Sequence, residues 1–464
     1  MGEIAYRAFV HACSAVHSDG IAPALIGVLE TDRRIIDVLP TFIGSHGVLV
    51  DSRQGANVAE LLLQKLGLAS TGPVLIYDAT PSERHYRNMV EICDVFPNAV
   101  YLSEKPLFTA RKQLSSLAKY GNRVLCDFIE TESLPALRLR EMQASGLKIE
   151  RFRFWRLNSI GFQKLLKPRM RTGVTGGAAI DKCIHDLAVA VSLQPCPDAS
   201  LGEPVVEQAD NYAYLPDPSD VSKTRFFTTD GRFARGIDLG TAEAAGYARV
   251  RWSSGLEGHF HYGWIGVEAY DRLSRDKRGE SLQSFMREIG IEEQLWLYRQ
   301  KIDAGPYAKF ASGDARIAVV EGLYQRSPVR LIVNFLDRPG VQPFIFETGR
   351  REFLPLRTHR HGNNSLARVF EHAIRQTQFW ARNGTHYLGR GIIENVHRTA
   401  FAIREKAFLH QGFVVCDEHL KSMRLMGEQI VQKYAPPGAS VGGFNPSQKF
   451  QITQHSGVPN ETLP

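Results

Sequence analysis

Short apolar runs and helical segments alternate through the first 125 residues. We expect strands at Tyr6–Val10, Pro23–Thr31, Val48–Val50, Val74–Tyr77 and Val100–Leu102, and helices at Ala56–Leu66, Glu83–Cys93 and Thr109–Lys119. Short strands separated by helices of about three turns are typical of a doubly wound parallel sheet. Ligands bind such sheets at the carboxyl ends of the strands, so the residues that follow each strand are the first candidates for chemistry.

From about residue 148 the apolar segments become longer and richer in β-branched and aromatic residues. Strands are expected at Ile149–Leu157, Thr224–Phe227, Tyr247–Trp252, His259–Ile265, Ile317–Tyr324, Val329–Phe335 and Phe344–Glu347. Glycine-containing turns join several of them, as in antiparallel sheets. Helical segments are expected at Gly176–Leu193, 280–302, Leu366–Ala381 and Gly391–Phe408.

This order predicts two domains and an arm. Residues 1–125 are expected to form an α/β Rossmann-like doubly wound sheet that binds a dinucleotide. Residues 126–410 are expected to form an α+β domain with a large open, mostly antiparallel sheet, interrupted by a helical insertion at about 280–302. The Gly/Pro/Ser-rich residues 411–464 are expected to form an irregular arm.

Composition narrows the class of protein. An apolar content of 43% with 23% charged residues is typical of a soluble globular protein, and no apolar run approaches the ~20 residues of a membrane span. The six cysteines are scattered without a CxxC pair, and the N-terminus lacks a secretory pattern, so we expect a cytoplasmic location. The net charge of +7 comes from interleaved rather than clustered cations, so we expect a small-molecule substrate and neither nucleic acid nor membrane as a partner.

An acid and an imidazole stand four residues apart in the apolar helix that follows Gly176-Gly177. Asp181 and His185 would leave the same face of that helix. A carboxylate beside an imidazole orients the ring and raises its basicity, as a general base requires. An ordinary i,i+4 pair on a helix surface is the alternative.

Two further motifs follow predicted strands. Glu104-Lys105-Pro106 places an ammonium at the carboxyl end of one strand, where proline restricts the lysine to an extended conformation. Ala79-Thr80-Pro81 follows the preceding strand and presents backbone N–H groups and a hydroxyl to a phosphate or ribose. An exposed turn and a plain helix cap are the respective alternatives.

In this order and spacing, the three motifs resemble the Gfo/Idh/MocA family, the oxidoreductases related to glucose–fructose oxidoreductase and inositol dehydrogenase. The resemblance implies NAD or NADP as cofactor, Lys105 near the reacting hydroxyl and nicotinamide, His185 as the base that takes the hydroxyl proton, and Asp181 as its orienting partner. Cofactor contacts implied by the motifs are Ala79, Thr80, Pro81, His85, Glu104 and Lys105. A homodimer or homotetramer through the C-terminal sheet is implied as well.

The segment after the first predicted strand departs from the family pattern. The family carries Gly-x-Gly-x-x-Gly there, so that the backbone can approach the pyrophosphate. This chain has Ala12, Cys13 and Ser14, which are small enough for a remodelled cofactor loop. The acid expected after the second strand is Glu30, Asp32 or Asp37, and Arg33 and Arg34 nearby would favour a 2′-phosphate.

The remaining candidates concern the substrate and metals. Trp155, Arg156 and Asn158, together with Lys105, Asp181 and His185, are predicted substrate contacts. Cations on the loop before the Gly-Gly pair suit an anionic substrate or a solvated surface; these are Lys164, Lys167, Arg169 and Arg171. The pairs His259/His261 and His359/His361 would each share a face on a strand, but a metal needs a third ligand, so we expect no metal site.

The leading hypothesis is an NAD(P)-dependent oxidoreductase that interconverts a secondary alcohol and a ketone on a sugar, cyclitol or similar polyol. The alternative keeps the fold without dinucleotide binding, as a non-redox enzyme of elimination or hydrolysis, or as a binding or assembly protein. The glycine-poor first loop favours the alternative, whereas Lys105, Asp181 and His185 favour an enzyme.

Overall fold

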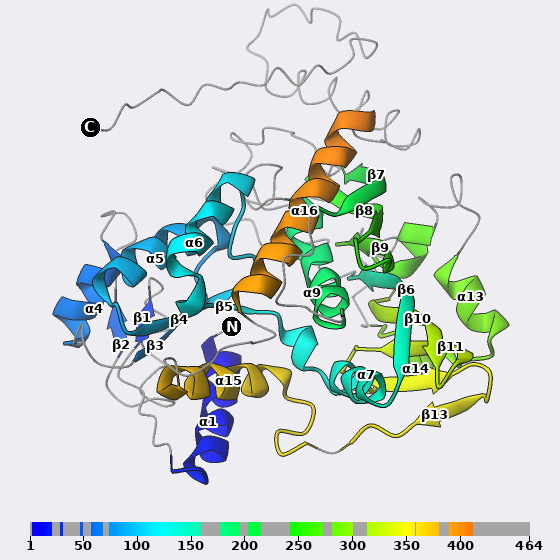
Figure 1. Ribbon diagram of the computed structural model, residues 1–464, viewed down its shortest axis with the longest axis horizontal. Helices are drawn as coiled ribbons and strands as arrows, with labels where there is room; N and C mark the ends of the chain where they lie inside the picture. Colours follow the sequence, from blue (N-terminus) through cyan, green and yellow to red (C-terminus); the bar gives the residue numbers. More distant parts are fainter. Residues whose placement is uncertain are drawn as a thin grey trace, which may run out of the picture.

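The computed structural model describes residues 2–20, 28–30, 47–49, 57–67, 74–158, 177–194, 203–214, 242–271, 281–299, 313–357, 359–379 and 389–411. Within them a half built on parallel strands lies beside a half built on one large sheet (Figure 1). No helix in these ranges is long and apolar enough to cross a bilayer. Three predicted segments lie outside the described residues: the strand Thr224–Phe227, the loop that carries Lys164 to Arg171, and the arm 411–464 apart from its first residue.

In the N-terminal half, the described residues form five parallel strands in two groups. β1 (Val28–Glu30) pairs with β2 (Gly47–Leu49). β3 (Val74–Asp78), β4 (Ala99–Glu104) and β5 (Val124–Asp127) form a second parallel sheet in that order. The connecting helices are α4 (Val58–Leu66), α5 (Ser82–Val95), a 3₁₀ turn η2 (Arg111–Ser116) and α6 (Leu117–Tyr120). The predicted parallel sheet is confirmed, and all three described strand ends of the second sheet carry an acid: Asp78, Glu104 and Asp127.

The first predicted strand is wrong, because residues 2–17 form the helix α1 (Gly2–His17). Ala8, Ala12 and Val16 are fully buried at intervals of four, which is helical spacing, whereas Val10 in the same apolar run is 43% exposed. The buried stripe packs on α15 (Ser365–Phe379), where the rings of Phe9 and Phe370 lie 5.8 Å apart. The first described strand is therefore β1, which lies inside the predicted second strand.

The C-terminal half is organised by an eight-stranded sheet of order β13-β12-β11-β10-β6-β9-β8-β7. Its strands are β6 (Leu147–Leu157), β7 (Val205–Tyr214), β8 (Ala242–Arg251), β9 (Glu257–Gly263), β10 (Ala315–Tyr324), β11 (Ser327–Asn334), β12 (Phe344–Glu347) and β13 (Glu352–Leu354). Only the β6–β9 pair within this described sheet is parallel, so the predicted mostly antiparallel sheet is confirmed. The edge strands β7 and β13 were not predicted from the sequence.

Helices cover both faces of the large sheet. On one face lie α7 (Leu134–Ala144), the π-helical turn η7 (Ala179–Cys183), α9 (Ile184–Ser192) and α16 (Arg390–Gln411). The predicted insertion forms α13 (Leu282–Glu288) and α14 (Glu293–Trp296) against the other face. There Phe285 stacks on Trp155 of β6, with ring centroids 6.3 Å apart.

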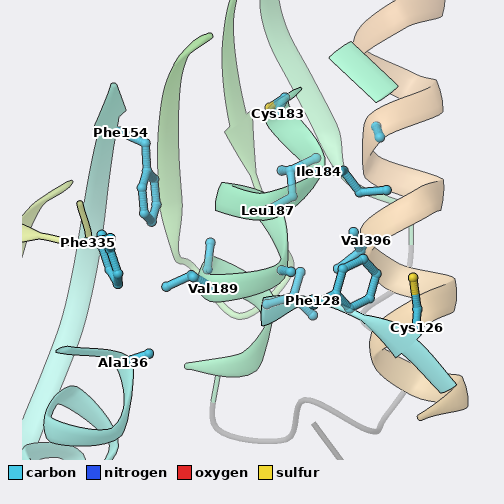
Figure 2. Packing of buried hydrophobic residues seen from close by; sticks show 14 of the residues in the cluster. Cys126, Phe128, Ala136, Phe154, Cys183, Ile184, Leu187, Val189, Phe335 and Val396 are labelled. Atoms are coloured by element: carbon cyan, nitrogen blue, oxygen red, sulfur yellow. The ribbon is translucent and has the colours of Figure 1, made fainter. Parts of the chain in front are cut away.

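The core continues between the two halves. Figure 2 shows Ile184, Leu187 and Val189 of α9 between Phe154 of β6 and Val396 of α16. In the opposite direction α15 packs against β3, β4 and β5, and α16 packs against β5. The last two described helices therefore return to the N-terminal half and bring the two sheets together.

Candidate functional site

Lys105 joins the two halves of the molecule directly. It follows β4, and its Nζ donates to the backbone oxygen and to Oδ1 of Asp181 on η7, both at 2.9 Å. The Lys105–Pro106 peptide bond is cis. Both side chains are mostly buried, at 14% and 18% exposure. The sequence motifs that carry these two residues therefore meet in space, 76 positions apart in the chain.

His185 lies one residue into α9 and is 7% exposed. Its Nδ1 is 2.5 Å from Oε2 of Glu130, which lies on the 3₁₀ turn η4 (Ile129–Glu132) directly after β5. Asp181 stands on a π-helical turn, where the spacing of side chains differs from that of an α-helix, and its Oδ1 accepts from Lys105. That Asp181 also orients His185 stays a prediction.

Glu130 was not among the predicted site residues. Glu130 lies three residues after the end of β5. Because ligands bind parallel sheets at the carboxyl ends of the strands, its position could have indicated it as a candidate. Its Oε1 accepts from Arg156 Nη1 at 2.8 Å and from Arg316 Nη1 at 3.4 Å. Arg156 Nε also donates to Asp186 Oδ1 at 2.9 Å, so a chain of alternating charges lies beneath His185.

The adjacent residues Trp155 and Arg156 point to opposite faces of β6. Arg156 is 4% exposed within its ion pairs, and Trp155 is 3% exposed, stacked on His261 with ring centroids 5.0 Å apart. Neighbouring strand residues alternate between faces, so these two side chains do not share a surface, and the predicted contact of each with substrate stays a prediction. Asn158 directly follows β6, and its contact with substrate stays a prediction.

Burial controls the charges at this site. It lowers the pKa of His185 to about 3; Glu130 opposes that shift, and the cations of Lys105 and Arg156 add to it. Burial acts to raise the pKa of Glu130, but Arg156, His185 and Arg316 outweigh it and hold that pKa well below its ordinary range. Burial raises the pKa of Asp186 to about 6, against the opposing effect of Arg156. At neutral pH the pair is thus a neutral imidazole beside a carboxylate.

The strand ends beside Lys105 are braced by internal hydrogen bonds. Asp78 accepts from the backbone N–H of Thr80 at 2.9 Å and from the amide of Asn88 at 2.9 Å. The ring of His85, 1% exposed, lies between two backbone oxygens: Nε2 is 2.7 Å from that of Thr80 and Nδ1 is 2.8 Å from that of Pro106. The imidazole therefore ties the Ala79–Pro81 loop to the loop of Lys105. Whether Ala79, Pro81 and Glu104 touch a cofactor stays a prediction.

The predicted cofactor loop at residues 12–14 is wrong, because these residues belong to α1. Ala12 is fully buried, Ser14 Oγ donates to the backbone oxygen of Val10 at 3.1 Å, and burial raises the pKa of Cys13 to about 11. The sequence that follows the first described strand, residues 31–43, contains no glycine either. In the whole sequence Gly-x-Gly occurs once, at Gly389-Arg390-Gly391 where α16 begins, and Gly-x-Gly-x-x-Gly does not occur.

The predicted histidine pairs have ordinary partners. On β9, His259 Nε2 lies 2.6 Å from Glu257, and His261 Nδ1 lies 3.1 Å from the hydroxyl of Tyr270. His361 Nε2 lies 2.7 Å from Glu371. Over the part of the chain that the structure describes, no three His, Cys, Asp or Glu side chains are grouped as a metal site would require.

With this geometry, the chain is similar over most of its length to solved sugar and cyclitol dehydrogenases. A levoglucosan dehydrogenase in complex with NADH and levoglucosan is 14% identical with a TM-score of 0.55, over 87% of this chain and 95% of that one. A myo-inositol 2-dehydrogenase from Lactobacillus plantarum is 12% identical with a TM-score of 0.51, over 88% and 95%. A variant of KijD10, a 3-ketoreductase from Actinomadura kijaniata in complex with TDP-benzene and NADP, is 13% identical with a TM-score of 0.51, over 84% and 90%.

The chain has the fold of these dehydrogenases. The predicted resemblance to the Gfo/Idh/MocA family is therefore confirmed for the fold, since the similarity spans both halves of the molecule. No protein-family model and no curated protein matches the sequence.

Proposed function

We propose that this chain is an NAD(P)-dependent oxidoreductase that interconverts a secondary alcohol and a ketone on a sugar, cyclitol or similar polyol. The observation that carries the proposal is a pair of contacts after neighbouring parallel strands: Lys105, which follows β4, binds Asp181, and Glu130, which follows β5, lies 2.5 Å from His185. The similarity in fold to dehydrogenases of levoglucosan and myo-inositol supports this class of substrate.

The residues divide the work as follows. The Lys105 ammonium has three N–H donors and directs two contacts at Asp181, so one donor remains for the substrate oxygen. His185, kept neutral by burial, takes the hydroxyl proton as general base during oxidation and returns it during reduction. Asp181 holds the ammonium in place. The nicotinamide ring, when bound, supplies the acceptor or donor of the hydride.

The carboxyl groups at the strand ends beside Lys105 fit a nicotinamide riboside. Glu104 ends β4 half-buried beside Asp127, with which it pairs in register, and their carboxyl groups suit ribose hydroxyls or a carboxamide. The pyrophosphate end lacks the glycine fingerprint, so any dinucleotide must be held there by other groups than a Gly-x-Gly-x-x-Gly backbone.

Fluorescence titration of the chain with NADH and with NADPH tests this proposal. We expect saturable binding of at least one of them, with an isotope-labelled hydride transferred to a ketose or inosose. If neither dinucleotide binds at millimolar concentration, the redox function is wrong.

The second candidate function involves no hydride transfer. The chain would then be an enzyme of elimination or hydrolysis that uses Lys105 and His185, or a binding or assembly protein. The absence of Gly-x-Gly-x-x-Gly from the sequence favours it. In an elimination, exchange of a substrate carbon-bound proton with deuterated solvent occurs without any dinucleotide. That exchange assay separates the two candidates.

We also propose a cytoplasmic homodimer or homotetramer that pairs through the large sheet. On the sheet face that carries Trp155, α13 and α14 cover one part. Another part carries a network of ion pairs, formed by Arg249, Arg251 and Arg151 with Glu257 and Glu207. In a two-fold dimer, a second copy would place the same charged groups opposite this network. Light scattering at increasing ionic strength tests it, since a charged interface dissociates as salt rises.

A further inference from the structure

Glu130 and His185 form a buried pair. Glu130 is 4% exposed and His185 is 7% exposed. The two facing atoms, Oε2 and Nδ1, are buried and 2.5 Å apart, and neither has a hydrogen-bond partner at a normal angle within the described part of the chain. Two lone pairs would repel each other at this distance, so a proton lies between these two atoms.

The charges around Glu130 decide which atom carries the proton between them. Arg156 and Arg316 both donate to Oε1, so the carboxylate stays ionised and Oε2 is an acceptor. An acceptor at 2.5 Å requires a proton on Nδ1. A neutral imidazole has one N–H, so Nε2 then keeps its lone pair.

We propose that Glu130 is the positioning residue of His185: it fixes the tautomer with the proton on Nδ1 and leaves Nε2 as the base toward the substrate hydroxyl. This rests on the function proposed above. During oxidation the substrate O–H bond breaks and an Nε2–H bond forms, which makes an imidazolium whose charge the Glu130 carboxylate offsets. A bound nicotinamide would accept the hydride from the carbon that carries this hydroxyl.

The ion pairs beneath hold Glu130 rather than His185. Arg156 lies between Glu130 and Asp186, at 2.8 Å and 2.9 Å, and within the described residues no hydrogen bond joins the side chain of Asp186 to that of His185. Asp186 therefore offers a matched control: Glu130→Gln and Asp186→Asn each remove one carboxylate from Arg156, but only the first changes the partner of Nδ1.

The experiment compares the wild type, Glu130→Gln and Asp186→Asn by steady-state kinetics and by nitrogen NMR of labelled histidine, with the His185 signal assigned by its loss in His185→Ala. We expect Glu130→Gln to lower kcat by roughly 10²–10⁴-fold with KM within about threefold, because an amide no longer fixes the tautomer. Asp186→Asn should lower kcat by less than about tenfold. Glu130→Asp should restore part of the loss.

The NMR measurement needs no turnover. The wild type should show Nδ1 protonated and Nε2 unprotonated at neutral pH, and Glu130→Gln should show both tautomers. If the wild type carries its proton on Nε2, the proposal is overturned, whether or not Glu130→Gln folds. Equal losses of kcat in Glu130→Gln and Asp186→Asn would also overturn it. If the tautomer is as stated but no dinucleotide binds, the redox function fails while the pairing stands.

Discussion

Replacing Asp127 with asparagine tests how burial sets charge at the sheet edge. Asp127 ends β5 at 4% exposure; Tyr77 donates to its Oδ2 at 3.3 Å, and its Oδ1 has no hydrogen-bond partner within the described ranges. Burial raises the pKa of Asp127 to about 8, and the carboxylates of Glu104 and Glu130 add to the rise. The folded chain therefore keeps a proton that the unfolded chain releases near the ordinary value of 3.8.

The sign and size follow from linkage. Between these two pKa values the folded state binds one more proton than the unfolded state, so its stability falls as pH rises, by at most about 1.4 kcal/mol per pH unit. From about pH 5.5 to about pH 7.5 this is an upper limit of roughly 2–3 kcal/mol. Asp127→Asn carries no such proton. Relative to the wild type, the variant should gain up to that free energy of unfolding across the interval.

Urea unfolding of both proteins at the two pH values measures this difference. Asp94→Asn is the control: hydrogen bonds from Lys119 and Tyr120 lower the pKa of Asp94, so this carboxylate is ionised in both states above about pH 5.5. Its difference from the wild type should stay constant with pH. If Asp127→Asn runs parallel to the wild type instead, Asp127 is ionised in the folded state and the reasoning fails.

Four further predictions concern the site and the sheet. Lys105→Met should lower kcat/KM by roughly 10²–10⁴-fold in steady-state assays while circular dichroism stays unchanged; near-normal turnover would remove its assignment. The pKa of His185 is lowered to about 3, so His185 should stay unprotonated and should not reduce kcat/KM as the pH falls from about 8 to about 5. A loss of kcat/KM with a midpoint near pH 6.5 that disappears in His185→Ala would contradict this. Gly322→Ala should destabilise strongly in thermal unfolding, since a Cβ there would lie 2.0 Å from the backbone oxygen of Lys148; an unchanged Tm would contradict the bulge geometry. Trp155→Ala should cost about 3–5 kcal/mol in urea unfolding, and less than about 1 kcal/mol would mean the stack does not hold α13.

Most of the fold was predictable because its signals are local. The strands β3 and β4 coincide with predicted apolar runs, and α5 with a predicted helix, whereas β5 was not predicted. The prediction for the N-terminus was wrong because the apolar run Tyr6–Val10 fits a strand as well as a helix. Only the four-residue spacing of Ala8, Ala12 and Val16 indicates the helix. The edge strand β7 failed because its segment, Val205–Tyr214, mixes polar residues without clear alternation.

The site was predictable to the extent that strand ends specify it. Lys105 follows a strand, so its place at the sheet edge was expected. The motif that contains Asp181 predicted that a residue of the second half would lie beside it. The π-helical turn at Ala179–Cys183 could not be seen, because it depends on packing and not on a residue type. After that turn, His185 faces Glu130, whose carboxylate is paired with arginines from two other strands.

The position of Lys105 itself depends on the far end of the chain. The backbone N–H of Phe108, three residues on, donates to Nε2 of His397 on α16 at 3.3 Å, and Nδ1 of that ring donates to the backbone oxygen of Ile393 at 2.8 Å. Arg111 adds a two-bond ion pair to Glu405 on the same helix, at 2.8 Å and 2.9 Å. These contacts span almost 300 positions, so no local pattern specifies them. They fix the loop of Lys105 from one side while Asp181 fixes its ammonium from the other, which means that the two halves must dock before the site exists.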